Sequence, residues 1–346
     1  MGACLRWRGV AARFLLAFTA TFLDTASADA HIKWFCGYDV AGQPRGLARV
    51  FCTQFGQLVG LAVLLLLIAC ALERTFLGEA LLNALDRVTR WLRVNTEVVV
   101  RVVCAFFFTA LWGMDGVLLT PELKTTLPFV PWLQLAIAAS LMFRRTLPFS
   151  ALGIVILYAL AEWNYGAFHL MDYPIFLGVA CYLALLGLNI ELPGGWRPVD
   201  VLRWAAGITL IWASVEKWAY PEWSFPLLTL YPEMTMGFDQ ELYMRAAGVV
   251  EFTLAFALLW TPLVRRAAAL MLAGMFISAI FEFGALDAIG HSAIIAVMLA
   301  VAADDARPQW HRRSALLVPL AYAAAIIAVL APYYGGHALL YGTAIM

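Results

Sequence analysis

Glu251 is a carboxylate inside an apolar segment, which makes it the first candidate for chemistry in this sequence. In LYMRAAGVVEFTLAFALLW it lies about nine residues, or roughly 13 Å, from the start of the expected helix. An ionised carboxylate at that depth in a membrane needs a cation, water or a protein interior around it. Arg245 lies on another helical face and pairs better with Glu241, at i,i+4.

The partner that we expect for Glu251 is Lys217, from the segment WASVEKWAYPEW. The two residues form a candidate catalytic pair, in which the glutamate takes or gives a proton and the lysine stabilises its charged form. A structural ion pair, or a protonated glutamate bonded to the backbone, is the alternative that the sequence leaves open.

Histidines and acids also occur together at two predicted helix ends. They are Glu162, His169 and Asp172 at the first end, and Glu282, Asp287 and His291 at the second. Imidazole beside carboxylate can bind a metal or relay protons, so His169 and His291 are candidate metal ligands. Neither stretch has the spacing of a zinc motif such as H-E-x-x-H, and no particular metal is predicted. Helix capping or contact with lipid headgroups is the alternative role.

The amino terminus has the order of a secretory signal. Arginines precede the apolar stretch FLLAFTATF, and small residues follow it. Residues 1–28 are therefore predicted to be a signal peptide, or an anchor helix if the signal is not cleaved. Both alternatives place His31 on the far side of the membrane.

His31 is a conditional metal ligand. Cleavage after Ala28 would leave Asp29-Ala30-His31, whose amine, amides and imidazole can surround a square-planar Cu(II) or Ni(II) ion. Cleavage after Ala30 would expose an amino-terminal histidine, which also chelates copper. Alternatively, the following KWF docks on the membrane surface, and without cleavage the copper site does not exist.

The composition is that of a membrane protein. Apolar residues make up 63% of the chain and charged residues 13%, against about a quarter in soluble domains. Mean hydropathy is +0.82. The net charge of zero gives no reason to expect a nucleic-acid partner. Unbroken apolar runs favour an all-α, polytopic helix bundle in a lipid bilayer over a β-barrel.

About ten apolar runs are long enough to approach or cross the hydrocarbon layer. They lie near 54–72, 97–114, 129–143, 148–164, 173–190, 201–218, 243–261, 266–283, 286–302 and 314–332. With an exported amino terminus, every predicted inner loop carries arginine, including Arg144-Arg145 and Arg265-Arg266. This distribution predicts a bacterial inner-membrane protein whose mature termini are both periplasmic.

An internal repeat is predicted from two segments that align without gaps, LWGMDGVLLTPEL at 111–123 and IWASVEKWAYPEW at 211–223. Four spans in each copy would relate the copies by an axis along the membrane normal. The predicted parts are a signal or anchor at 1–28, a periplasmic segment at 29–53, a first span with an amphipathic cytoplasmic segment at 54–95, four-helix units at 96–190 and 198–303, and a last span with a periplasmic tail at 314–346.

Residues 201–303 resemble the DoxX-like family of small four-helix membrane proteins. The stretches that carry the resemblance are ASVEKWAYP, AGVVEFTLAFALLWTPLVRRAAALMLAG and DAIGHSAIIAVML. The resemblance implies a membrane subunit linked to quinone or to thiol and oxidative-stress enzymes, and marks Glu251 and Lys217 as its polar positions. If spans near 97–190 are a diverged copy, the resemblance extends to them.

Two classes of function follow from these patterns. The first is a redox-linked subunit with a periplasm-facing polar site, which uses a quinone and receives electrons from a periplasmic or membrane partner. The second is a transporter or copper-handling protein, in which the two four-helix units form a pathway. A non-catalytic assembly subunit is a third alternative.

Overall fold

The computed structural model describes residues 33, 36–307 and 316–344, and its regular elements in this part of the chain are helices. The main helices are α4 (Thr53–Glu73), α7 (Thr96–Met114), α8 (Val130–Ser140), α9 (Leu147–Tyr165), α11 (Pro174–Leu188), α12 (Pro198–Ala219), α14 (Gln240–Leu258), α15 (Pro262–Phe283), α16 (Ala285–Ala303) and α17 (Leu317–Tyr341). The short helices are α3 (Leu47–Val50), α5 (Phe76–Val88), α6 (Arg90–Val94), α10 (Ala167–Leu170), α13 (Phe225–Leu230) and the 3-10 turns η1 (Arg144–Thr146), η2 (Pro193–Gly195), η3 (Pro221–Trp223) and η4 (Pro232–Thr235).

Each apolar run of the sequence coincides with one of the main helices, which confirms the all-α prediction for the described residues. Within the described residues, six helices are long and apolar enough to cross a membrane: α4, α7, α9, α15, α16 and α17. Helices α8 and α11 are shorter, and α12 and α14 carry several charges. The chain is therefore an integral membrane protein, while the count of ten spans and the repeat stay predictions.

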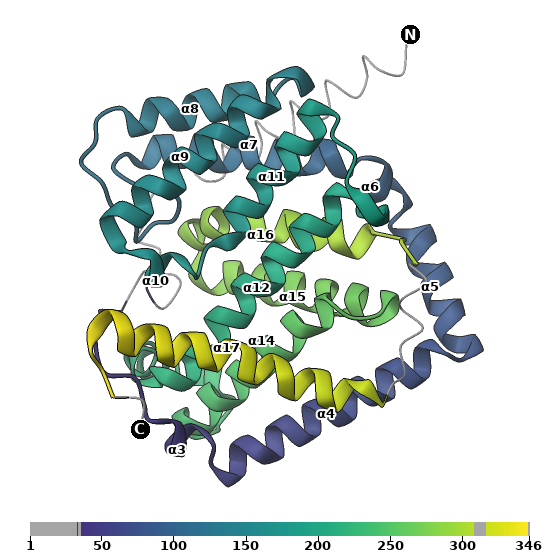
Figure 1. Ribbon diagram of the computed structural model, residues 1–346, viewed down its shortest axis with the longest axis vertical. Helices are drawn as coiled ribbons and strands as arrows, with labels where there is room; N and C mark the ends of the chain where they lie inside the picture. Colours follow the sequence, from purple (N-terminus) through teal and green to yellow (C-terminus); the bar gives the residue numbers. More distant parts are fainter. Residues whose placement is uncertain (1–32, 34–35, 308–315, 345–346) are drawn as a thin grey trace.

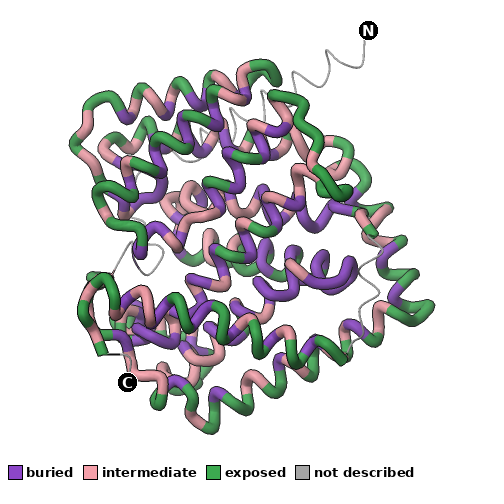
Figure 2. The backbone as a smooth tube through the Cα atoms, viewed as in Figure 1, coloured by how far each residue is buried: buried purple, intermediate pink, exposed green. Residues whose placement is uncertain are grey.

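Helix α12 lies at the centre of the bundle (Figure 1) and packs against α11, α14, α16 and α17. Helices α7, α8 and α9 lie on one side of it, and α4 and α17 on the other (Figure 1). Exposed residues follow the outer helix α4, whereas every residue of α16 is buried or half-buried (Figure 2). Beyond Gln57 the exposed side chains of α4 are apolar, among them Leu61 and Ile68, as expected for a helix that faces lipid.

Glycine allows α12 and α14 to approach closely. A Cβ atom at Gly248 on α14 would overlap the indole Nε1 of Trp218 on α12. The Trp218 indole donates a hydrogen bond to the carbonyl oxygen of Arg245 at 3.3 Å. This contact fixes the register of the two helices and holds Lys217, the neighbour of Trp218, opposite α14.

Buried arginines distinguish one end of the bundle, which we call the Arg265 end. Arg265 and Arg266 are completely buried in the first turns of α15 and are not loop residues, contrary to the sequence-based expectation. Arg265 pairs with Asp304 at 3.1 Å, and Arg266 pairs with Asp86 of α5. The arginines are buried because carboxylates from two other segments neutralise them.

The carboxyl-terminal helix also differs from expectation. The sequence predicts a last span near 314–332 followed by a periplasmic tail, but α17 continues to Tyr341. His337 is completely buried, and its ring nitrogens lie 2.7 Å from the carbonyl oxygen of Val40, 2.9 Å from the hydroxyl of Tyr220 and 2.6 Å from that of Thr343. The buried imidazole holds this helix in place and connects it to the amino-terminal segment.

Candidate functional site

A cavity of about 110 Å³ lies between α11, α12, α14, α15 and α16, at the end of the bundle opposite the Arg265 end. We call it the polar cavity. Its charged or imidazole lining consists of Lys33, Asp172, Glu216, Glu251 and His291, and its aromatic lining of Tyr173, Phe176 and Phe276. Helix termini supply Asp172, Glu216 and His291, so the polar groups gather where the apolar helices begin or end.

Lys33 is the cation of a buried three-residue group in this cavity. Its ammonium forms ion pairs with Asp172, which precedes α11, and with Glu216 of α12, the latter at 2.6 Å. The ammonium also lies 5.6 Å from the ring centre of Tyr38 and 5.7 Å from that of Trp223, within the range of cation–π attraction. Burial lowers the pKa of Lys33, but the two carboxylates outweigh burial and raise its pKa above the ordinary value.

His169 of α10 lies beside the Lys33 group and is 3% exposed. Its ring centre is 5.5 Å from that of Tyr38, 5.7 Å from that of Tyr165 and 6.0 Å from that of Tyr173. Burial, assisted by the charge of Lys33, lowers the pKa of His169 to about 4. The imidazole is therefore neutral at physiological pH, and its Nε2 has no hydrogen-bond partner within the described residues.

A tyrosine and a glutamate form a second buried polar pair. The Tyr173 hydroxyl, on the cavity wall, donates a hydrogen bond to the carboxylate of Glu122. Burial raises the pKa of Glu122, and burial also raises the pKa of Tyr173. A phenol and a carboxyl group thus share a hydrogen bond at the edge of the cavity.

The ion pair between Lys217 and Glu251 is present, which confirms the predicted pairing. Glu251 lines the polar cavity, whereas Lys217 lines a separate basic pocket on the other side of the pair. Arg245 binds Glu241 at 3.7 Å, also as predicted, and does not take part in the pair. Glu251 is therefore a carboxylate at the cavity wall, and the ammonium of Lys217 neutralises its charge from the side of the basic pocket.

His291 and Asp287 of α16 form a further polar pair beside the cavity. The Nδ1 atom of His291 lies 2.8 Å from Oδ2 of Asp287, which is 1% exposed. The imidazole stacks on Phe276 of α15, with ring centres 4.9 Å apart. The carboxylate and the phenyl ring together fix the orientation of the imidazole at the cavity.

The structure brings together most of the predicted site residues. Glu251, Asp172 and His291 line the cavity, and Lys217, Asp287 and His169 lie directly behind it. Glu162 and Glu282 do not join them, because both are exposed at helix ends. The position of His31 is outside the described residues.

Four residues of the site lie outside the sequence-based predictions: Lys33, Glu122, Tyr173 and Glu216. Lys33 comes from KWF, which the sequence suggests as a membrane-surface contact, and no spacing connects it with Asp172. The position of Glu216 can be inferred in part from the sequence, because it directly precedes Lys217 and adjacent residues of a helix point in different directions. It therefore pairs with Lys33 while Lys217 pairs with Glu251.

The described residues contain no group of three or more His, Cys, Asp or Glu side chains that could hold a metal ion. His169 faces tyrosines, and His291 pairs with Asp287 on its own helix. The polar cavity instead offers hydrogen-bond donors, acceptors and aromatic faces to a small organic molecule.

Comparison with known proteins gives no relative: no family model matches the chain, and no curated protein or solved structure matches it. The site is therefore interpreted from its own geometry. The resemblance to the DoxX-like family stays a prediction.

Proposed function

We propose that this membrane protein is a DoxX-like, redox-linked subunit that binds a quinone headgroup in the polar cavity. The observation that carries the proposal is the convergence of Glu251, His291 and the Lys33 group on one aromatic-walled space inside the bundle. A quinone ring needs flat apolar neighbours for its faces and hydrogen-bond donors for its two oxygens. Phe276 and Phe176 supply the former, while Lys33 and His291 are the donors.

Reduction of a quinone to a quinol consumes two electrons and two protons. In the proposed reaction, the electrons come from a partner redox protein, and the quinone oxygens receive the protons. Glu251 and His291 exchange these protons with the aqueous phase, and Lys217 and Asp287 stabilise the charged forms that result. We infer from the arginine distribution that the cavity faces the periplasmic side of a bacterial inner membrane.

The experiment is the measurement of quinone that copurifies with the full chain from bacterial membranes, by extraction and mass spectrometry. We expect bound quinone in the unaltered protein, and at least a tenfold loss in Phe276→Ala, which removes the stacking surface beside His291. Glu251→Gln keeps the shape of the cavity, so it should retain quinone but slow its reduction by the captured partner.

The matched control for Glu251→Gln is Glu282→Gln, since Glu282 is an exposed glutamate at the end of α15, outside the cavity lining. This control should leave both quinone content and reduction unchanged. Absence of quinone from the unaltered protein, together with no captured redox partner, would refute the proposal.

Transport is the other function that the sequence suggests, and it has less support. A transport pathway needs polar groups through both halves of the bundle. Here part of the cavity wall is apolar and consists of Phe176, Leu210 and Ile294. Buried ion pairs of Arg265 and Arg266 occupy the opposite end of the bundle. Flux of protons or copper into vesicles that Glu251→Gln abolishes would favour transport over quinone binding.

A further inference from the structure

An apolar groove of about 280 Å³ lies between α4, α14 and α15. On α4 its wall extends from Leu58 to Ala69, a rise of roughly 16 Å at 1.5 Å per residue. That length is about half of the roughly 30 Å hydrocarbon layer. Leu65 and Met271, which line the groove, are 56% and 57% exposed, so it opens toward lipid. The groove therefore has the depth of one membrane leaflet.

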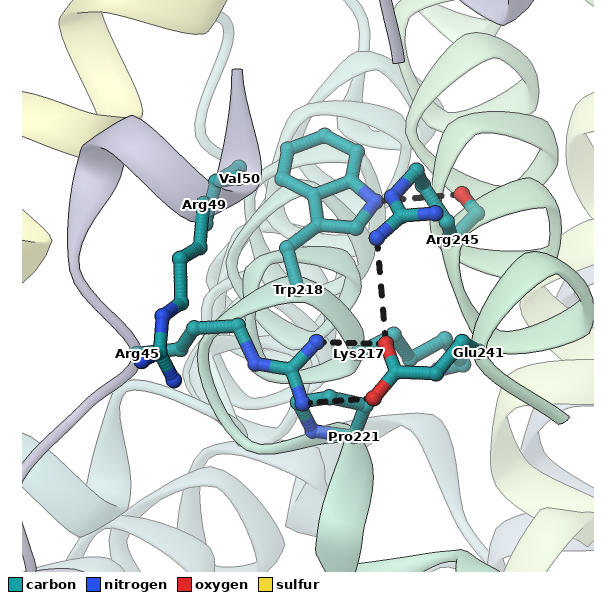
Figure 3. A pocket seen from close by; sticks show the side chains of 8 residues that line it. All are labelled: Arg45, Arg49, Val50, Lys217, Trp218, Pro221, Glu241 and Arg245. Atoms are coloured by element: carbon teal, nitrogen blue, oxygen red, sulfur yellow. Dashed lines mark hydrogen bonds and ion pairs between the residues drawn. The ribbon is translucent and has the colours of Figure 1, made fainter. Parts of the chain in front are cut away.

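A basic pocket adjoins the Leu58 end of this groove, and Figure 3 shows the side chains that line the basic pocket. Its cationic residues are Arg45, Arg49, Lys217 and Arg245. Arg245 directly precedes Ala246, a residue of the groove wall on α14. The Arg245 Nη1 atom also donates a hydrogen bond to Gln54 Oε1 of α4 at 2.6 Å. Because this bond connects two of the three helices that form the groove, the basic pocket lies directly beside the end of the groove.

Carboxylates neutralise the two inner cations of the basic pocket. Arg45 binds Glu222 and holds Glu241 with both of its terminal nitrogens, at 2.5 and 2.8 Å. Lys217 forms the ion pair with Glu251 described above. These ion pairs involve all three carboxylates that lie near the described basic pocket: Glu222, Glu241 and Glu251.

The two remaining cations lack a carboxylate of their own. Arg245 reaches only Glu241, at 3.7 Å, and shares it with Arg45. Arg49 of α3 is exposed, and its guanidinium makes no hydrogen bond or ion pair with the described part of the chain. One positive charge is therefore unmatched at the mouth of an apolar groove.

We propose that the basic pocket and the groove together bind one anionic glycerophospholipid. Its phosphate accepts hydrogen bonds from Arg49 and Arg245, since guanidinium groups suit the paired oxygens of a phosphate diester. One acyl chain fills the groove beside α4, and basic pockets between membrane helices are known places for acidic headgroups. Trp218, which lines the same pocket, is a residue type that favours headgroup depth. The bound lipid joins α3 and α4 to α14.

The test is native mass spectrometry of the full chain, released from detergent after incubation with equal amounts of phosphatidylglycerol and phosphatidylcholine. The structure predicts one strongly retained phosphatidylglycerol per chain. Arg49→Gln should weaken its retention about fivefold, the effect of one basic residue near a charged headgroup. Arg49→Lys, which keeps the charge, should restore most of it. Ala246→Phe should block the acyl chain and reduce retention while the basic pocket stays intact.

Arg145→Gln is the matched control, because Arg145 is an exposed arginine on η1 that belongs to neither pocket. It should retain phosphatidylglycerol like the unaltered chain, and thermal unfolding would verify that each variant is folded. Equal retention of the two lipids would overturn the proposal. So would unchanged retention in both Arg49→Gln and Ala246→Phe, or binding of glycerol phosphate alone as strong as that of the lipid.

Discussion

At the residue scale, the environment of each ionisable group matters more than its type. His169 and His337 are both buried, yet His337 has polar neighbours at both ring nitrogens, while the Nε2 of His169 has none in the described part of the chain. His337 therefore has a structural role. His169 stays neutral beside Lys33 and makes the folded state sensitive to acid.

Acidification from pH 6.5 to pH 4 should destabilise the protein through His169. Its folded pKa of about 4 lies below the ordinary value of 6.5, so the unfolded chain binds the proton first as the pH falls. Stability is complete above pH 6.5, and about 3 kcal/mol is lost on the way to pH 4. His169→Gln should remove this component, measured as the difference in unfolding free energy between variant and unaltered protein at each pH. An equal pH dependence in both proteins would contradict the prediction.

At the element scale, the spacing of α12 and α14 determines the geometry of the site. Gly248 permits the close approach, and Lys217 faces Glu251 because Trp218 is packed against that glycine. A helix pair held by one small residue is sensitive to any added volume at that point.

Gly248→Ala should lower the free energy of unfolding by about 1–3 kcal/mol, because the new methyl group overlaps the Trp218 indole. Gly274→Ala on α15 provides the control, since a Cβ there meets no atom within 4 Å. That substitution should be neutral, or stabilise by about 0.5–1 kcal/mol, as expected inside a helix. Thermal unfolding in detergent measures both, and equal effects of the two substitutions would show that crowding at Trp218 is not the cause.

At the scale of the whole molecule, the two ends of the described chain hold one another. The carboxyl-terminal end lies beside α3 (Figure 1), and His337 on α17 contacts the carbonyl of Val40. Tyr334 on the same helix donates a hydrogen bond to the carbonyl of Arg45 at 2.7 Å. These bonds fix the segment before α4, which carries Lys33 and two arginines of the basic pocket, Arg45 and Arg49.

His337→Ala should release this segment. The loss of buried hydrogen bonds should cost about 1–3 kcal/mol, since their partners are left unsatisfied. Amide hydrogen exchange of residues 40–46 should accelerate at least tenfold, while exchange in α8, far from His337, stays the same. Protection of residues 40–46 equal to that in the unaltered protein would show that α17 does not hold the segment.

The sequence by itself determined the membrane class and the positions of the main helices, because unbroken apolar runs satisfy the backbone only as helices in a bilayer. It also predicted the pairing of Lys217 with Glu251, since a deep carboxylate favours a nearby cation and Arg245 lies on the wrong helical face, and the structure contains this pair.

Only the tertiary structure decided the composition of the polar cavity. Lys33 is 139 residues from Asp172 and 183 from Glu216, so no local pattern connects them. The sequence predicts Arg265 and Arg266 to be basic loop residues. Both are nevertheless buried, because they form ion pairs with Asp304 and Asp86. The physical reason is the same in both cases: the cost of burying a charge depends on its neighbours in space, and the order of the chain does not specify those neighbours.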